Sequence, residues 1–198
     1  MLFIGDLMET LFEEISALLT KNGVTVRLGE EIPGCLGKFN KQTFTITLAA
    51  EQDASVLAHE AVHWLQKVYR DNKIRGVPGL EGLDPLVFNP NLPHTEAMSI
   101  VQAVNLFYRP KAWEEEIPAF ALEKDPQRVL FLLREVDKNL KSGRLRMPKP
   151  FRETPLIVGM LMSGLANLFC YYLGIYLGVI AATAILLICT YLLTTAEY

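Results

Sequence analysis

The segment VLAHEAVHWL, residues 56–65, holds the residues whose types and spacing best suit metal chemistry. His59 and His63 are four residues apart, so on a helix their imidazoles share one face and can reach a single ion at about 2.0–2.1 Å. Glu60 follows the first histidine and lies beside the ion, where a general base would take a proton from metal-bound water. The pattern predicts a Zn²⁺ site with Glu60 as its catalytic residue.

An amphipathic core helix whose histidines happen to lie four apart is the alternative explanation of this segment. Apart from the two histidines and the glutamate, the segment is uncharged, and it contains neither proline nor glycine. A core helix seldom carries two histidines and a glutamate, because buried polar groups need partners. The composition of the segment therefore favours the metal site.

The sequence VLAHEAVHWLQ resembles the active-site helix of zincin metallopeptidases, especially the small HExxH peptidase-like domains in which a hairpin precedes this helix and a glutamine follows it. The resemblance covers about residues 24–124 and is specific in the helix. It implies a zinc-dependent peptide hydrolase that acts on a peptide or protein substrate. The metzincin subclass is excluded, because Gln66 and Tyr69 stand where its pattern requires glycine and histidine.

The remaining gluzincin type implies a third metal ligand from a glutamate on a later helix. In KAWEEEIPAFALE, residues 111–123, Glu116 is followed by alanines at positions 119 and 121, which resembles the E-x-x-A-x-A pattern of glutamate-ligand helices. Glu115 is the alternative ligand, and at least two of the three consecutive glutamates are expected to be a solvated helix N-terminus. Pro118 fits this assignment only if it lies in the first turn of its helix.

Four further side chains are candidates for roles near the site. His94 follows a proline and is a candidate for contact with substrate or metal. Tyr69 and Tyr108 are candidates for donating a hydrogen bond to an oxyanion. Cys35 is expected to be a small hydrophobic residue in a tight turn. The sequence has no phosphate-binding glycine loop, nucleotide-binding fingerprint or serine-centred elbow.

The elements that must position the site follow from the periodicity of apolar residues. The active-site helix is expected at 54–69 and is preceded by a hairpin. These elements predict an α+β fold, a zincin-like domain with a small β-sheet, the active-site helix and further helices. The other expected elements are strands at 24–28, 35–39 and 43–48, helices at 5–21, 94–108, 111–123 and 126–141, and a long loop at 71–93.

The C-terminal part of the chain differs sharply from the rest. No charged side chain occurs from Thr154 to Ala196. Because a membrane-spanning helix needs roughly 20 apolar residues, this run predicts a C-terminal transmembrane helical hairpin with spans at about 155–171 and 175–194. The predicted domains are a zincin-like metallopeptidase domain at 1–150 and a transmembrane segment at 151–198.

The charge distribution predicts where the protein acts. Basic residues cluster between Lys141 and Arg152, so the positive-inside rule predicts a membrane protein whose catalytic domain faces the cytoplasm, with membrane lipid as a partner. The N-terminus lacks the basic region of a signal peptide. The net charge of −3 gives no global basic field for binding nucleic acid. Three cysteines cannot form a disulfide framework, which favours a reducing compartment. No pattern indicates an oligomeric state.

A second function fits the same layout. A structural or membrane-inserting protein, for example a viral one, could carry a vestigial or merely stabilising zinc site. Zinc content and the sensitivity of proteolysis to Glu60→Gln separate the two hypotheses, since only a peptidase needs the general base.

Overall fold

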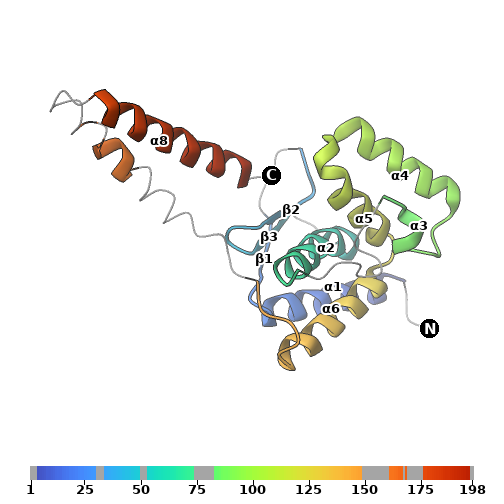
Figure 1. Ribbon diagram of the computed structural model, residues 1–198. Helices are drawn as coiled ribbons and strands as arrows, with labels where there is room; N and C mark the ends of the chain where they lie inside the picture. Colours follow the sequence, from blue (N-terminus) through green and yellow to red (C-terminus); the bar gives the residue numbers. More distant parts are fainter. Residues whose placement is uncertain are drawn as a thin grey trace. The chain divides into compact units, whose positions relative to one another are not determined.

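The computed structural model describes residues 4–29, 34–49, 53–73, 83–148, 161–166, 168 and 176–196. The contacts within it group the chain into two compact units, Met1–Pro150 and Phe151–Tyr198. The first unit contains a small sheet and most of the helices (Figure 1). Its strands are β1 (Thr25–Leu28), β2 (Gly37–Asn40) and β3 (Thr45–Leu48), and its helices are α1 (Ile4–Lys21), α2 (Ala54–Asp71), α3 (Pro85–Phe88), α4 (His94–Phe107), α5 (Trp113–Glu123) and α6 (Pro126–Lys141).

The sheet has the strand order β1-β3-β2, with β1 parallel and β2 antiparallel to the central strand β3. Apolar and polar residues alternate along residues 43–48, so the apolar side chains share one face of the sheet. Phe44, Ile46 and Leu48 on this face are almost fully buried. The predicted hairpin is confirmed, although β2 begins two residues later than expected. Within the described residues β2 pairs on one side only, so it is an edge strand.

Helix α2 lies at the centre of the first unit. Asp53 caps its N-terminus by accepting a hydrogen bond from the backbone N–H of Ser55 at 2.7 Å. The helix packs against α1, α5 and α6 and against strands β2 and β3, which buries most of its circumference. A helix enclosed in this way gives its side chains little freedom to move, which suits a site that must be held rigidly.

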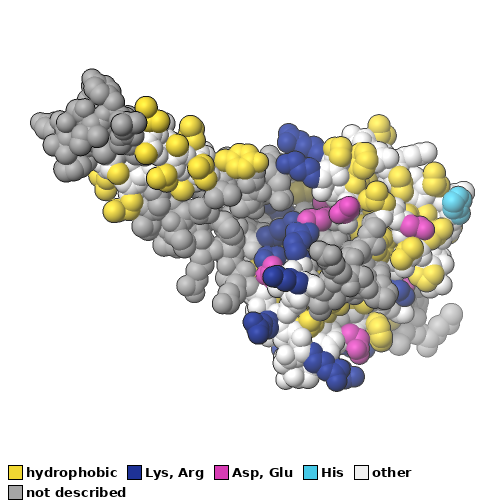
Figure 2. All heavy atoms as spheres, in the orientation of Figure 1, with side chains coloured by type: hydrophobic (Ala, Val, Ile, Leu, Met, Phe, Trp, Pro, Cys, Tyr) yellow, Lys and Arg dark blue, Asp and Glu magenta, His cyan; other side chains and the backbone are white. Residues whose placement is uncertain are grey.

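Helix α4 packs against α5 and α3 through one face, which includes Ala97, Ile100 and Val104. Its other face leaves large apolar side chains exposed, including Leu106 and Phe107, and hydrophobic atoms gather on this part of the surface (Figure 2). The helix therefore supports α5 from the side away from α2.

Most of the predicted helices of the first unit are present with similar ends. Helix α6 begins at residue 126 as expected. Asp125 is its N-cap and accepts a hydrogen bond from the backbone N–H of Arg128, and Pro126 is its first residue. The loop expected at 71–93 is only partly a loop, because Asp84 caps the short helix α3 inside it. A 3₁₀ turn, η1 (Pro110–Ala112), directly precedes α5.

The predicted α+β class is wrong for this molecule. Helices account for most of the described residues, whereas each of the three strands has only 4 residues. The strands predicted at 24–28, 35–39 and 43–48 were five or six residues long, but pairing is limited to the four-residue register that β1, β3 and β2 share. The fold is therefore mainly helical, with a small three-stranded sheet.

The second unit contains α8 (Tyr176–Ala196) and a helical stretch at 161–166. In the part of the chain that the structure describes, no helix combines the length and the apolar character that crossing a bilayer requires. The predicted transmembrane hairpin is therefore wrong, and the membrane location with a cytoplasm-facing domain falls with it. The charge-free run sets an upper limit on apolar length, but a span also needs one continuous helix, and much of 155–171 lies outside the described residues.

Candidate metal centre

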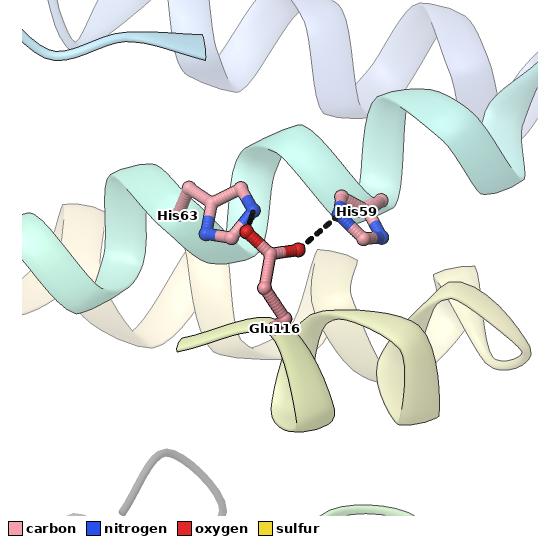
Figure 3. Close-up of side chains that lie close together, drawn as sticks. All are labelled: His59, His63 and Glu116. Carbon is pink, nitrogen blue, oxygen red and sulfur yellow. Dashed lines mark ion pairs between the residues drawn. The ribbon is translucent and has the colours of Figure 1, made fainter. Parts of the chain in front are cut away.

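Two helices bring three potential metal ligands together. His59 and His63 project from successive turns of α2, and Glu116 projects from α5 into the space between them (Figure 3). The Nε2 atom of His59 lies 3.5 Å from Oε2 of Glu116, and the Nε2 atom of His63 lies 3.7 Å from Oε1 of the same carboxylate. The structure thus places side by side the three residues that the sequence predicted as ligands.

These separations suit a small tetrahedral ion. Ligand atoms bound at about 2.0–2.1 Å around a tetrahedral centre lie roughly 3.3 Å from one another. One ligand atom from each of the three residues lies within 4.8 Å of the other two. Only small side-chain rotations would close the cluster around zinc, and a fourth position would remain for another ligand.

The second nitrogen of each histidine is also engaged. His59 Nδ1 lies 3.1 Å from Oε2 of Glu123, and His63 Nδ1 lies 3.0 Å from Oε1 of Gln66. When each Nδ1–H donates to its oxygen, each Nε2 is left as the lone-pair nitrogen directed toward Glu116. Metal-binding histidines are commonly oriented in this way, with the other ring nitrogen held by a carboxylate or carbonyl group.

Glu123 and Gln66 were visible in the sequence, but their roles were not predicted. Gln66 is three residues after His63, and Glu123 is seven residues after Glu116, so each lies on the same helix face as the ligand it follows. Phe120 completes this surrounding shell, since its ring meets that of His59 edge to face with centroids 4.5 Å apart. The i,i+3 and i,i+7 spacings were the signals that would have identified the two polar residues.

Glu60 lies beside the cluster and is not one of its ligand atoms. It is only 6% exposed, and its carboxylate accepts a hydrogen bond from the backbone N–H of Phe39 on β2. Burial raises the pKa of Glu60 to about 7, although the charge of His59 and the Phe39 N–H act in the opposite direction. The edge strand therefore holds a buried carboxylate next to the two histidines.

A glycine makes this approach of strand and helix possible. A Cβ atom on Gly37 would lie 2.8 Å from Cγ1 of Val56 and 3.0 Å from Oε1 of Glu60. Any larger residue at this position would press on the Glu60 side chain. Gly37 is therefore required by the close packing of β2 on α2.

The two histidines have opposite proton affinities. Burial disfavours the charged form of His59, but hydrogen bonds to Glu116 and Glu123 outweigh it and raise its pKa to about 9. Burial and the neighbouring charge of His59 lower the pKa of His63 to about 4. Without an ion, one histidine therefore carries the charge that balances the surrounding carboxylates.

Glu115, the alternative ligand, faces away from the histidines. Its carboxylate lies 2.6 Å from Nζ of Lys41 and 2.5 Å from Nη2 of Arg70. Burial alone would raise the pKa of Glu115, but these two cations outweigh burial and lower the pKa to about 2. Of the two adjacent glutamates, the structure directs Glu116 to the cluster and Glu115 to the ion pairs.

The condition that the sequence placed on Pro118, a position in the first turn of its helix, is not met. Pro118 lies inside α5, beyond the first turn, rather than near the start of the helix. Proline has no N–H to donate to the carbonyl of Glu114, so one helical hydrogen bond is missing there. Glu116 still reaches the histidines, because it lies in the first turn, before the interruption.

Of the four other candidate residues, Tyr108 is electrostatically coupled to the site, whereas Tyr69, His94 and Cys35 are not members of the ligand cluster. Burial and the carboxylates of Glu116 and Glu60 raise the pKa of Tyr108 to about 12, so its hydroxyl lies within electrostatic range of the cluster. The pKa of Tyr69 is raised by burial and by Glu135, on a different helix. His94 is exposed at the start of α4, and Cys35 is exposed with a free thiol.

Comparison of the chain with protein-family models, with curated proteins and with solved structures gives no match.

Proposed function

We propose that this protein is a zinc-dependent peptidase in which His59, His63 and Glu116 hold the metal. The observation that carries the proposal is the orientation of the two imidazoles. The Nδ1 atoms are paired with side-chain oxygens of Glu123 and Gln66, and both Nε2 atoms are directed at one carboxylate. Two histidines that merely pack in a core would not be expected to direct the same ring nitrogen at one shared carboxylate.

The donor set indicates which ion fits. Two neutral imidazoles and one carboxylate form a three-ligand zinc site with one open position, the arrangement of catalytic rather than structural zinc. Zinc bound there would act as a Lewis acid that polarises a carbonyl oxygen and lowers the pKa of a coordinated water. The side chains supply the rest of the chemistry.

Glu60 is suited to moving the proton. It is adjacent to the ligands, buried, and accepts a hydrogen bond from the Phe39 N–H. As general base it would accept the proton of the attacking water on a carboxylate oxygen and then deliver it to the leaving amine. Tyr108, whose hydroxyl is within electrostatic range of Glu116 and Glu60, is the candidate donor of a hydrogen bond to the developing oxyanion.

The edge strand favours a peptide as the substrate. The N–H of Ala49 donates to the carbonyl of Leu36 at 2.8 Å, so the alternation of an antiparallel ladder turns the main-chain groups of Gly37 and Phe39 away from β3. These groups lie next to Glu60. An extended peptide could pair with this edge and present a carbonyl group to the site.

The full-length chain tests the proposal through metal content and turnover. We expect about one zinc per chain and cleavage of a mixed peptide library, detected by mass spectrometry. Glu60→Gln should keep the zinc and lose about 10²–10⁴-fold in rate, because glutamine cannot accept the proton. The exposed neighbour of the ligands, Glu114, provides a control, and Glu114→Gln should change neither property.

Two results would overturn the proposal. A wild-type chain that binds no zinc would make the cluster an internal ion-pair network between His59 and its carboxylates. The second result is a chain that binds one zinc but shows no peptide cleavage that depends on Glu60. The site would then be structural, which is the alternative suggested by the sequence.

A further inference from the structure

Glu115, in the first turn of α5, makes three contacts with side chains of other elements. Its carboxylate binds Lys41 and Arg70, at 2.6 and 2.5 Å. Its backbone carbonyl accepts a hydrogen bond from Nε2 of Gln66 at 2.8 Å. The next residue in the chain is Glu116, so these contacts fix the backbone from which that ligand projects.

The three partners come from the elements that build the site. Lys41 lies in the turn between β2 and β3, Arg70 in the last turn of α2, and Gln66 one turn after His63. Gln66 also binds His63 Nδ1 through Oε1. One chain of hydrogen bonds therefore runs from a histidine of α2 to the main chain of α5.

Helix α5 needs such external support because its own sequence provides little. No side chain caps its N-terminus, and Ala112, which precedes it, already has a helical conformation. Pro118 removes a helical hydrogen bond shortly after Glu116. The start of α5 is thus not fixed by the usual local devices.

A simple surface ion pair is the competing explanation. The side chain of Arg70 is 57% exposed, and exposed pairs generally contribute little. The carboxylate of Glu115, however, is only 22% exposed and is shared by two cations, and Gln66 on the other side is buried. Lys41, Arg70 and Gln66 therefore form a clamp on Glu115 at the N-terminus of α5, rather than an isolated ion pair.

We infer that Glu115 is a positioning residue that holds Glu116 over the two histidines, with Lys41 and Arg70 as its anchors. The inference rests on the proposed metal site and assigns a role to a residue outside the ligand set. Replacing a residue that orients a metal ligand typically reduces metal affinity 10- to 100-fold. Loosening the clamp should weaken metal binding in that range and alter the ligand geometry.

Titration of the metal-free full-length chain with Co²⁺ tests this, because the visible spectrum of the ion reports both affinity and coordination geometry. Glu115→Gln should bind Co²⁺ roughly tenfold more weakly than the wild type, with a changed spectrum. Lys41→Gln and Arg70→Gln should each produce part of this effect, and neither should add to Glu115→Gln in a double variant, since the contact is already lost. Glu114→Gln is the matched control and should behave as the wild type.

Thermal unfolding of the metal-free variants separates positioning from folding. The positioning role predicts that the spectral change appears in folded Glu115→Gln protein. Should Glu115→Gln not fold, Lys41→Gln carries the test. A variant with the affinity and spectrum of the wild type would overturn the inference and leave the metal site standing. A wild-type chain that binds neither Co²⁺ nor Zn²⁺ would overturn both together.

Discussion

Helices α2 and α5 both contribute to the candidate metal centre, but different forces fix them in place. Helix α2 has 18 residues, a side-chain cap at Asp53 and a buried circumference. Helix α5 has 11 residues, no side-chain cap and an internal proline. The ligands of one cluster therefore come from a helix whose start is capped by its own sequence and from a helix whose start is held by contacts with other elements.

This difference explains why the ligands were not equally predictable. Two histidines four residues apart must share a face on any helix, so their pairing follows from spacing. The position of Glu116 depends on where α5 begins and on what holds it there. Contacts of Glu115 with Lys41, Arg70 and Gln66 fix the first turn of α5, and all three residues lie far from α5 in the sequence.

The largest expected effects come from removing ligands from either helix. His63→Ala and Glu116→Ala should each weaken Zn²⁺ binding by more than about 100-fold, because a lost ligand costs more than a lost outer partner. Competition with a chromophoric chelator measures this. Glu114→Ala, on the exposed side of α5, is the control. Equal affinities of Glu116→Ala and Glu114→Ala would show that Glu116 is not a ligand.

The contact between β2 and α2 gives the next largest effect. Gly37→Ala should destabilise the fold by about 1–3 kcal/mol, the typical effect of overpacking, because its Cβ would lie 2.8 Å from Val56 Cγ1. Denaturant unfolding of the metal-free protein measures the change. Adding Val56→Ala should recover part of the loss, since it removes the closest atom. If Gly37→Ala proves neutral, the strand does not approach α2 as closely as described.

The sequence was informative where a local rule determines the outcome. The helical spacing of the histidines, the alternation in residues 43–48 and the Asp125–Pro126 start of α6 all matched the structure. The choice between Glu115 and Glu116 remained open, because both lie in the same helical turn and only distant cations distinguish them.

Global properties were predicted less well than local ones. Alternating apolar residues do not reveal how long a shared register will be, so each strand was predicted one or two residues too long. Absence of charge in residues 155–194 indicated apolar character but not the continuous spanning helices that were inferred from it. A first-turn position of Pro118 was the condition for Glu116 as a ligand, yet Pro118 lies inside α5, which packs against α2 and α4, and Glu116 still reaches the histidines.

The N-cap positions of α2 and α5 should respond differently to substitution. Asp53→Ala should cost about 1 kcal/mol of stability, because the side chain satisfies a free N–H at the start of α2. Ala112→Asp should give α5 no comparable gain, because Ala112 has φ −87° and ψ −15°, whereas a cap residue is extended. Thermal or denaturant unfolding measures both. A gain of about 1 kcal/mol in Ala112→Asp would mean that α5 can be fixed locally after all.

The smallest expected effect lies between α1 and α6, which supply no ligand to the cluster and so serve as a reference for α2 and α5. Asp137 on α6 binds the ammonium groups of Lys21 and Lys141, each at 3.0 Å. These bonds hold the pKa of Asp137 below its usual value despite burial. A carboxyl group with a lowered pKa stabilises the fold above its unfolded pKa, about 3.9, and this contribution disappears as the pH falls through the lower, folded-state pKa.

Asp137→Asn should therefore reduce stability at neutral pH by about 1 kcal/mol or less, because the two lysines are 48% and 61% exposed and solvent screens them. The gap between variant and wild type should begin to narrow below about pH 4, where the carboxylate of the unfolded chain becomes protonated, and should close as the pH falls through the lower pKa of the folded state. The gap should also shrink at high salt. Unfolding in denaturant across this pH range measures it. Zinc affinity should stay unchanged, in contrast to every ligand variant. A gap that does not vary with pH would show that Asp137 acts through packing rather than charge, and a loss of zinc affinity would mean that α1 and α6 also help to position the cluster.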